Sequence, residues 1–234
     1  MQHRSAVLLS GGLDSAVMLA MELADGREVW PIHVRVGLAW EDAEARAIER
    51  VVDGAPFVGR IHPVTTLRFD MRDVYPPGHW AVAGRAPAYD EPDETVYLEG
   101  RNVTLITKAA VFCAGRGIGR VVLGPLAGNP FPDATPAFFD AMAHALSLGL
   151  AHDITVAAPL AALNKEDVVR IGRDLGVALD RTLSCMSPVD GEHCGRCNKC
   201  RERREAFRDA GITDATVYDA LVRSPSRGSP HRPS

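Results

Sequence analysis

The hexapeptide Ser-Gly-Gly-Leu-Asp-Ser at residues 10–15 constrains the fold more than any other part of the sequence. It joins the apolar run at residues 6–9 to the helix-like run at residues 16–23, so a strand, a glycine-rich turn and a helix follow one another. Because glycine has no Cβ, backbone N–H groups in such a turn can surround an anion at the positive end of the helix. The pattern predicts a phosphate-binding loop with Ser10 and Ser15 as extra donors; an ordinary capped turn is the simpler alternative.

This loop is neither of two common nucleotide-binding motifs. No Gly-Lys-Ser/Thr follows at the Walker A spacing, and the Gly-x-Gly-x-x-Gly of dinucleotide folds is absent. The loop instead resembles the pyrophosphate loop of the N-type ATP pyrophosphatases, which cleave ATP between its α and β phosphates and adenylate a substrate oxygen. The resemblance implies a catalytic Asp14 and an ATP-binding stretch made of Leu9, Ser10, Gly11, Gly12, Leu13, Asp14, Ser15 and Ala16.

The rest of the chain alternates between strand-like and helix-like patterns. Strands are expected at residues 6–9, 29–36, 57–64, 121–124 and 154–160, and helices at 16–23, 41–52, 103–114, 138–150 and 163–172. This order predicts an α/β fold: an open parallel five-stranded sheet with helices on both faces, similar to the adenine nucleotide alpha hydrolases and other Rossmann-like folds. We expect Pro31 at the beginning of its strand or at a sheet edge, and Asn164 as a helix cap.

Three units are expected along the chain. Residues 1–180 form the ATP-pyrophosphatase α/β domain, residues 181–223 a small zinc-binding helical segment, and residues 224–234 a disordered tail of Ser, Pro, Arg, Gly and His. Residues 68–96 are interrupted by proline and glycine and predict a long loop. That loop is either a cover over the mouth of the site or a surface insertion without a role.

Further site residues follow other strands or open other helices. Gly100-Arg101-Asn102 precedes a buried helix, where Arg101 can hold two oxygens and Asn102 is a candidate cap; a surface arginine beside a plain cap is the alternative. Lys165 opens the helix after the last strand, within reach of phosphates or else on a solvated face. The resemblance implies that the strand end at Gly37 meets adenine and that Gly100, Arg101 and Asn102 contact nucleotide or substrate.

Four of the five cysteines lie close together near the C-terminus. Cys185, Cys194, Cys197 and Cys200 have the spacing Cys-x8-Cys-x2-Cys-x2-Cys, which is typical of a closed tetrahedral zinc site that holds structure. An iron–sulfur cluster is the rival interpretation, and redox disulfides are a third. His193 is a further potential ligand. Cys113, alone in an apolar helix, is expected to be a buried structural thiol.

Composition excludes several classes of protein. The 234 residues carry a formal net charge of −4, which does not favour general nucleic-acid binding. No apolar run reaches the length of a membrane span, and no signal peptide precedes the first strand, so a cytoplasmic protein is expected.

The charged helix after the cysteines places Arg201, Arg203 and Arg204 either toward an anionic substrate or on a solvated face.

The two ends of the chain together resemble one family, the 7-cyano-7-deazaguanine synthases. The motifs that carry this resemblance are residues 10–15, 100–102, Phe131-Pro132-Asp133, Lys165, and residues 184–200 with Arg203 or Arg204 and Phe207 behind them. The resemblance implies adenylation of 7-carboxy-7-deazaguanine by ATP, displacement of AMP by ammonia, and a second adenylation that leaves the nitrile. It also implies Mg²⁺, catalytic Lys165 and Arg101, substrate binding by Phe131 and Asp133, and a homodimer.

Two motifs depart from the family pattern. Val36-Gly37-Leu38 stands in place of Tyr-Gly-Gln, and Ala134-Thr135 follows Phe131-Pro132-Asp133 in place of Cys-Arg. Gly128 and Asn129 stand where the family has an Asp. Three alternatives therefore remain: a divergent member acting on another carboxylate or a tethered deazapurine, a tRNA-modifying adenylating enzyme, and a zinc-containing binding module without activity.

Overall fold

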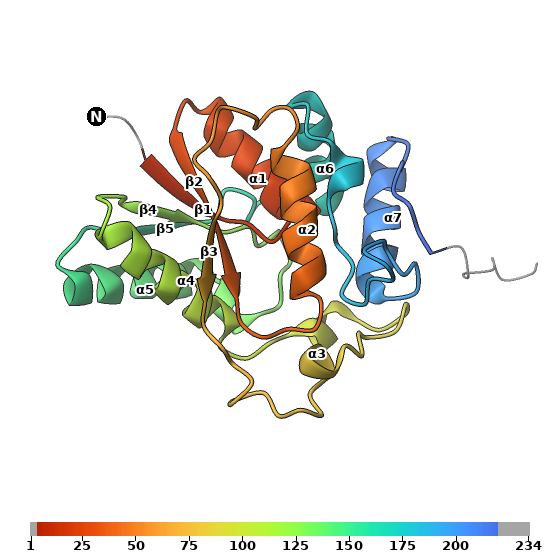
Figure 1. Ribbon diagram of the computed structural model, residues 1–234, viewed down its shortest axis with the longest axis horizontal. Coiled ribbons are helices and arrows are strands. Elements are labelled where there is room, and N and C mark those ends of the chain that lie inside the picture. The colour runs from red at the N-terminus through yellow and green to blue at the C-terminus, as the bar shows by residue number, and fades with distance from the viewer. Residues whose placement is uncertain (1–3, 220–234) are drawn as a thin grey trace, which may run out of the picture.

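Five parallel strands form one sheet in the order β3-β2-β1-β4-β5 in the computed structural model, which describes residues 4–219 (Figure 1). The strands are β1 Arg4–Leu8, β2 Glu28–Arg35, β3 Thr65–Arg68, β4 Arg120–Val122 and β5 Thr155–Ala157. The predicted fold class is confirmed. The strand order reverses between β1 and β4, so the carboxyl ends of these strands open a crevice at the point where doubly wound folds bind ligands. The tail predicted for residues 224–234 lies outside the described residues.

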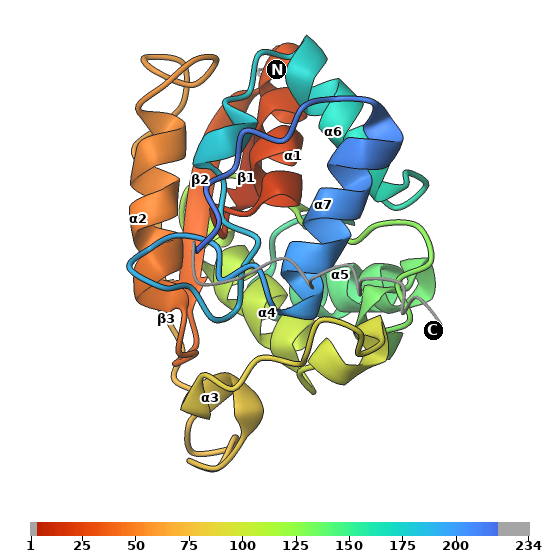
Figure 2. The same cartoon turned by 90° about the vertical axis from the view of Figure 1, so that its right-hand side faces the viewer.

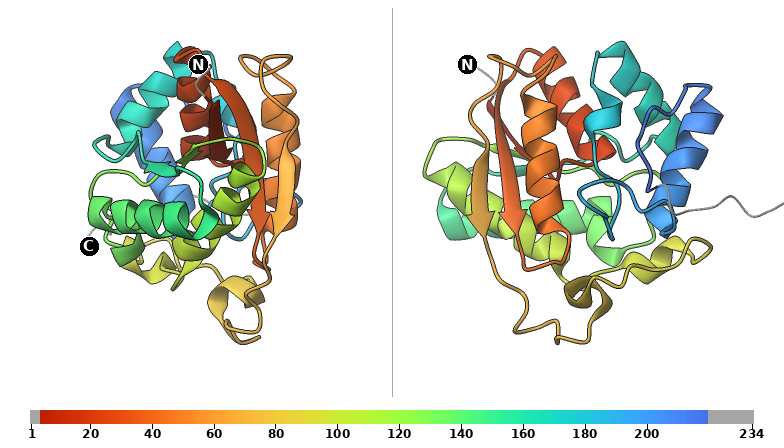
Figure 3. Two further views of the ribbon diagram at one scale, coloured as in Figure 1. Left: turned by 90° about the vertical axis from the view of Figure 1, so that its left-hand side faces the viewer. Right: turned by 45° about the vertical axis from the view of Figure 1, so that its right-hand side comes forward.

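Helices cover both faces of the sheet (Figures 1 and 3). One face carries α1 Leu13–Ala24, α2 Glu41–Val52, α6 Lys165–Asp174 and α7 Asn198–Ala210. The other face carries α4 Arg101–Ala114 and α5 Pro136–Leu150. The strands are apolar toward both layers, as expected for a parallel sheet buried on both sides. No helix among residues 4–219 has the length and apolarity needed to cross a membrane.

The cysteine-bearing segment packs on the α/β layers. Helix α7 lies beside α6 (Figure 2), and its Ala206 and Phe207 belong to the same buried cluster as Leu13 and Val17 of α1. Helix α7 therefore shares a core with the helix that begins at the phosphate loop, whereas the four cysteines pack in a separate buried cluster with Ala43 and Ala47 of α2.

Arg203 is a fully buried cation at the centre of this packing. Its guanidinium donates to Thr216 Oγ1 at 2.8 Å, Thr182 Oγ1 at 2.9 Å, Ser184 Oγ at 3.1 Å and the Leu179 carbonyl at 2.6 Å. Both predicted locations for Arg203, facing substrate or facing solvent, are wrong. A buried guanidinium needs several acceptors, and here they come from both sides of α7 along the chain.

The third strand lies later in the chain than predicted. Residues 57–61 form turns, and the pairing strand is Thr65–Arg68. Phe57 is completely buried in the core from its position in a turn. Within the apolar run at 57–64, Phe57 fills the core and Ile61 and Val64 pack against it, while Val58 is exposed. The strand itself alternates between half-buried and exposed residues and has a weak apolar signal. The fifth strand, Thr155–Ala157, is shorter than expected.

Pro31 lies in the middle of β2, which is an interior strand, so its predicted position is wrong. The carbonyl of Ile32 accepts from Leu9 of the β1 segment, and the carbonyl of Val29 accepts from His62 on the other side. Backbone groups alternate along a strand, so the nitrogen of Pro31 faces the β3 side. Pairing with β3 begins only at Ile32, so the missing N–H leaves no ladder bond unmade.

The segment at residues 68–96 contains short helices and is not one continuous loop. It includes α3 Trp80–Ala83 and the 3₁₀ turn η1 Asp93–Val96, and its middle part projects from the body of the protein (Figure 1). Two further 3₁₀ turns are η2 Pro132–Ala134 and η3 Leu179–Arg181. The far end of the segment, at Asp93 and Val96, lines the cavity described below.

Candidate active site and metal centre

A cleft with two lobes opens at the carboxyl ends of β1, β2 and β4. The first lobe, of about 270 Å³, is bounded by apolar residues such as Leu8, Ile32 and Leu105 on one side and by polar residues such as His33, Asn102 and Asp133 on the other. The second lobe, of about 450 Å³, is bounded by the loop after β4 and by charged side chains from α6 and α7. The lobes share a wall composed of Ser10, Gly12, Asp14, Glu44, Arg101, Gly124, Pro125, Asn129 and Phe131.

The predicted phosphate loop forms part of this shared wall. Gly12 is the N-cap of α1 without any side-chain cap, so backbone N–H groups of the first turn are not consumed by a capping side chain. Ser15 Oγ donates to the Gly12 carbonyl at 3.0 Å, and Ser10 Oγ accepts from the Gly12 N–H at 3.3 Å. These contacts fix the turn at the positive end of the α1 dipole, which is suited to an anion.

Gly11 supports the loop from behind. It has a φ of +77°, and a Cβ there would come within 3.0 Å of the Glu44 carbonyl, the Ile48 nitrogen and the Ala47 Cβ of α2. Only glycine therefore lets the loop pack this closely on α2. Gly11 does not line either lobe, so its contribution to the loop is conformational.

Three other sequence-predicted residues also lie outside the cleft wall. Ala16 is buried in the core of α1, and Gly100 is the N-cap of α4. The N–H of Gly37 donates to the Glu41 carboxylate at 3.0 Å. Leu9, Leu13, Ser10, Ser15 and Asp14 do line the cleft.

Lys165 and Asp14 meet across the second lobe, although they are 151 positions apart in the chain. Lys165 Nζ lies 2.5 Å from Asp14 Oδ2 and 3.3 Å from Glu202 Oε1. Burial disfavours the ammonium, but these two carboxylates outweigh burial and raise the pKa of Lys165. Asn164 caps α6 as predicted, and it does so in a capping box with Asp167 that fixes the start of the helix and positions Lys165.

Glu202 also holds a second lysine. Its Oε2 accepts from Lys199 Nζ at 2.7 Å, and Lys199 in turn lies 3.5 Å from Asp93. Burial raises the pKa of Glu202, but Lys165 and Lys199 more than offset this and lower the pKa to about 2. Glu202 is therefore ionised across the ordinary pH range and bridges two ammonium groups.

Glu44 is a buried carboxyl group in the shared wall. Burial raises its pKa to about 7, against the opposing charge of Arg101 and a hydrogen bond from Trp40 Nε1 at 3.1 Å. Arg101 also reaches both lobes, and its buried Nε has no hydrogen-bond partner among the described residues. A guanidinium with a free donor beside a carboxyl of near-neutral pKa is suited to binding and proton transfer.

Asp133 and Phe131 line the first lobe from the loop after β4. Phe131 stacks on Tyr97 with ring centroids 5.0 Å apart. Asn102 does not cap α4 as predicted, because it lies within the helix; its backbone N–H donates to Asp133 Oδ2 at 3.1 Å and its side-chain amide to the Asp133 carbonyl at 3.0 Å. Burial raises the pKa of Asp133 against these hydrogen bonds.

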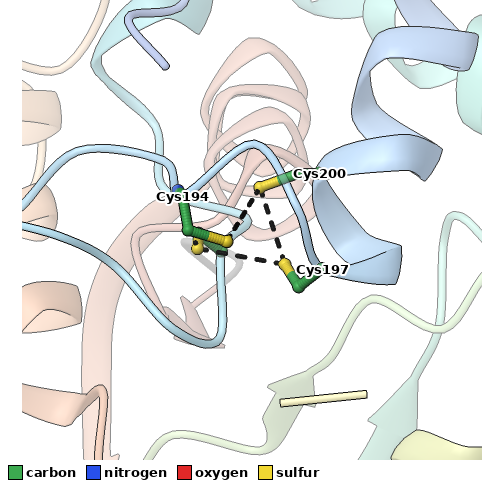
Figure 4. A group of neighbouring side chains, drawn as sticks. Cys194, Cys197 and Cys200 are labelled. Atoms are coloured by element: carbon green, nitrogen blue, oxygen red, sulfur yellow. Dashed lines mark hydrogen bonds between the residues drawn. The ribbon is translucent and has the colours of Figure 1, made fainter. Parts of the chain in front are cut away.

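The four cysteines converge on one point (Figure 4). Their sulfurs all lie within 4.8 Å of one another, with separations of 3.9 Å for Cys185–Cys197, 4.0 Å for Cys194–Cys200 and 3.5 Å for Cys197–Cys200. Four sulfurs at about 2.3 Å from a single tetrahedral ion lie about 3.8 Å apart, so the set fits one metal ion. His193 is not part of it, because its Nε2 accepts from the Ser184 N–H at 3.0 Å.

Cys113 lies apart from this centre, buried in α4 as predicted. Burial raises the pKa of its thiol to about 12. It lines neither lobe, so it is a core residue and not a nucleophile for the cleft.

Sequence reasoning missed five charged residues of the cleft: Glu44, Asp93, Glu166, Lys199 and Glu202. Glu44 has the appearance of a surface charge in an amphipathic helix, and nothing local shows that α2 turns it inward. Lys199 had a usable signal, because a residue between two metal-ligand cysteines has a fixed backbone. Glu202 lies one helical turn after Lys199, so it faces the same side of the helix and could have been found from Lys199.

These features define a doubly wound α/β protein with a phosphate-type loop at its topological switch point and a separate cluster of four cysteines whose geometry fits a metal ion. The family model described as Queuosine biosynthesis protein QueC matches residues 4–211. A relative from Anaeromyxobacter dehalogenans (strain 2CP-C), named 7-cyano-7-deazaguanine synthase, is 34% identical over 226 residues, covering 92% of this chain and 96% of its own. One of the same name from Azoarcus sp. (strain BH72) is 36% identical over 226 residues, covering 93% and 97%.

The chain belongs to this QueC family of queuosine biosynthesis proteins. Among solved structures, a 4-thiouridine synthetase–RNA complex with bound ATP has a TM-score of 0.47 and 16% identity, covering 89% of this chain and 51% of that one.

Proposed function

We propose that this protein is an ATP-dependent ligase that converts 7-carboxy-7-deazaguanine to 7-cyano-7-deazaguanine. The substrate carboxylate attacks the α-phosphate of ATP and releases pyrophosphate. Ammonia then displaces AMP to give the amide. A second ATP adenylates the amide oxygen, and loss of AMP and a proton leaves the nitrile. The observation that carries the proposal is the family match over residues 4–211 together with a cleft whose wall contains the phosphate loop.

The lobes suggest a division of the ligands. The first lobe combines apolar walls with a few hydrogen-bonding groups, which suits a flat base, and the charged second lobe suits the triphosphate, with the phosphate loop between them. Lys165 and Arg101 would stabilise charge on the α-phosphate and the leaving pyrophosphate, and Phe131 and Asp133 would bind the carboxylate substrate. Catalysis here needs mainly alignment of two anions, because AMP is a good leaving group.

Mg²⁺ is proposed as the ion that accompanies ATP. Even without Glu44, whose pKa is about 7, acidic side chains outnumber cations in the second lobe, with Asp14, Asp93, Glu166 and Glu202 against Arg101, Lys165 and Lys199. A free triphosphate would be repelled there, whereas its magnesium complex would not. Asp14 Oδ1, which is buried without a hydrogen-bond partner in the described chain, is the oxygen we assign to Mg²⁺.

Zn²⁺ is proposed for the four-cysteine centre. Three of the six sulfur separations, at 3.5–4.0 Å, match the edge of a single-ion tetrahedron, and four sulfurs within 4.8 Å of one another leave no room between them for a cubane of four irons. A closed thiolate set supplies structure and takes no part in the reaction. Such thiolates persist in a reducing compartment, which supports a cytoplasmic location; a homodimer is proposed from the family resemblance alone.

A second candidate is adenylation of a different carboxylate. It is supported by Ala134 and Thr135 in the substrate loop and by the Glu44 carboxyl in the shared wall. Thiolation of tRNA has less support, because Cys113 lies outside the cleft.

Mass spectrometry of products tests the proposal directly. Protein incubated with Mg²⁺-ATP, ammonium and 7-carboxy-7-deazaguanine should yield the nitrile and two AMP per nitrile formed. AMP formation with another carboxylate but not with this one would favour the second candidate, and ATP binding without any AMP would contradict both.

A further inference from the structure

Lys199 is a second ammonium group in the charged lobe, and the metal centre fixes its place. It is the second residue of α7, between Cys197 and Cys200. The backbone on either side of Lys199 is therefore tied to a buried metal ligand, while its side chain, about a quarter exposed, lines the second lobe. A residue held in this way cannot drift from the cleft while the metal is bound.

The carboxylate of Glu202 aligns Lys199 with Lys165. One oxygen of Glu202 lies 2.7 Å from Lys199 Nζ and the other 3.3 Å from Lys165 Nζ. Lys165 in turn contacts Asp14 of the phosphate loop. The two ammonium groups thus stand side by side along one wall of the lobe, at the level of that loop.

Each lysine retains donor capacity for a ligand. An ammonium group has three N–H donors. Among the described residues, Lys199 contacts Glu202 and Asp93, and Lys165 contacts Asp14 and Glu202, which accounts for two donors on each. The remaining donor on each side chain is available to an anion in the second lobe.

Lysine is rare in this chain and is concentrated at the second lobe of the cleft. The sequence has 26 basic Lys and Arg residues, of which three are lysines: Lys108, Lys165 and Lys199. Two of these three line the second lobe, and Lys108 lies on α4 outside both lobes. Lysine is a compact point charge that can turn from a carboxylate to a phosphate oxygen without the planar geometry that arginine requires.

We propose that Lys199 binds the pyrophosphate end of ATP, so that the metal-bearing segment contributes a ligand-binding cation to the active site, with Glu202 as its positioning residue. This rests on the proposed use of ATP. The metal centre then supports the reaction through geometry, because the same loop that holds the ion also places an ammonium group beside the leaving pyrophosphate.

Nucleotide affinity of the full-length, metal-loaded protein tests this proposal. Calorimetric titrations with α,β-methylene-ATP and separately with AMP, both with Mg²⁺, give two affinities. Their difference reports how much the pyrophosphate end of the nucleotide contributes to binding. Lys199→Gln should weaken the affinity for the ATP analogue roughly ten- to a hundredfold, which is the range for one charged hydrogen bond. The affinity for AMP should stay unchanged. Lys199→Arg should lose less, and Lys108→Gln is the matched control.

Asp93→Asn separates phosphate binding from a purely structural contact. If Lys199 only tied residues 68–96 to α7, then Lys199→Gln and Asp93→Asn would weaken both nucleotides equally. That result would overturn the proposal. If Lys199 binds phosphate, Asp93→Asn removes a carboxylate that competes for the Lys199 ammonium group. The variant should then bind the ATP analogue at least as tightly as the wild type.

Two readouts make the outcome decisive. The metal content of Lys199→Gln should equal that of the wild type, so that any loss of affinity is not a loss of the ion. Wild-type protein that binds neither nucleotide would overturn the proposed function and this proposal together. Wild-type protein that binds both, with Lys199→Gln unchanged, would overturn this proposal alone.

Discussion

Asn102 holds Asp133 at two points, through its backbone N–H at 3.1 Å from Oδ2 and its side-chain amide at 3.0 Å from the carbonyl. The first turn of α4 and the loop after β4 are thereby joined at the first lobe. Asp133 is buried there, and burial raises its pKa against the hydrogen bonds from Asn102. A carboxylate held in this way is a fixed acceptor for a substrate donor.

Asp133→Asn should therefore impair substrate binding more than nucleotide binding. The new amide presents an NH₂ group to the donors of Asn102, which loosens the loop and removes the charge. We expect KM for 7-carboxy-7-deazaguanine to rise about tenfold or more while affinity for AMP stays within about twofold. Steady-state kinetics and AMP titration measure the two quantities. An equal loss of both would assign Asp133 to nucleotide binding.

Lys165→Met should abolish most activity and also reduce stability. The substitution leaves Asp14 and Glu202 without their shared cation, and their side chains are only 28% and 21% exposed. We expect kcat to fall at least about 100-fold, with unfolding free energy lower by about 1–3 kcal/mol. Pyrophosphate release and urea unfolding report the two effects, and Lys108→Met serves as control. Activity close to wild type would remove Lys165 from the reaction.

Loss of the metal should destabilise the segment around α7. Cys194→Ser removes one of four converging ligands, so zinc should fall from one ion per chain to well below one. The midpoint of thermal unfolding should drop by about 10 °C or more. Cys113→Ser, which changes a thiol outside the centre, should keep the ion. Elemental analysis that finds iron and labile sulfide in place of zinc would contradict the zinc assignment.

Glu44 should give the free protein a specific pH dependence of stability. Its pKa is about 7 when folded against 4.5 as the ordinary value, so between these pH values the folded state binds more protons than the unfolded state. Unfolding free energy must therefore fall as pH rises from 4.5 to 7, by up to about 3 kcal/mol from this group. Glu44→Gln should remove that component.

Chemical unfolding at pH 5 and pH 8 measures the Glu44 effect as a difference between wild type and variant. Glu49→Gln, on an exposed position of the same helix, should leave the pH dependence of the wild type unchanged. If Glu44→Gln and wild type lose equal stability between these pH values, the raised pKa of Glu44 is contradicted.

Features that depend on neighbouring residues in the chain were predictable from sequence. The strand–turn–helix at Ser10 to Ser15, the alternation of strands and helices along the chain and the convergence of the cysteines all follow from spacing and apolar periodicity. The third strand was misplaced because the strongest apolar run near it fills the core from a turn at Phe57. Periodicity reports burial, and burial does not require a strand.

Features that depend on partners far along the chain were not predictable. Arg203, Glu202 and Lys199 look alike in a charged helix, yet one is fully buried and two line the cleft. Their positions follow from how α7 docks on α6 and from residues such as Thr182 and Lys165. A single sequence shows the charge of each side chain but not which acceptor it will find.

The hydrogen bonds of Arg203 set the length of the smallest unit that can fold. The family match ends at residue 211, but Thr216 accepts from the buried guanidinium, and the Asp219 N–H donates to the carbonyl of His193, next to Cys194. A chain shortened to the family boundary would leave a guanidinium N–H without an acceptor in the interior and would release one side of the cysteine loop. The stretch after residue 211 therefore closes the fold, and the end of the family-model match is not the end of the folded structure.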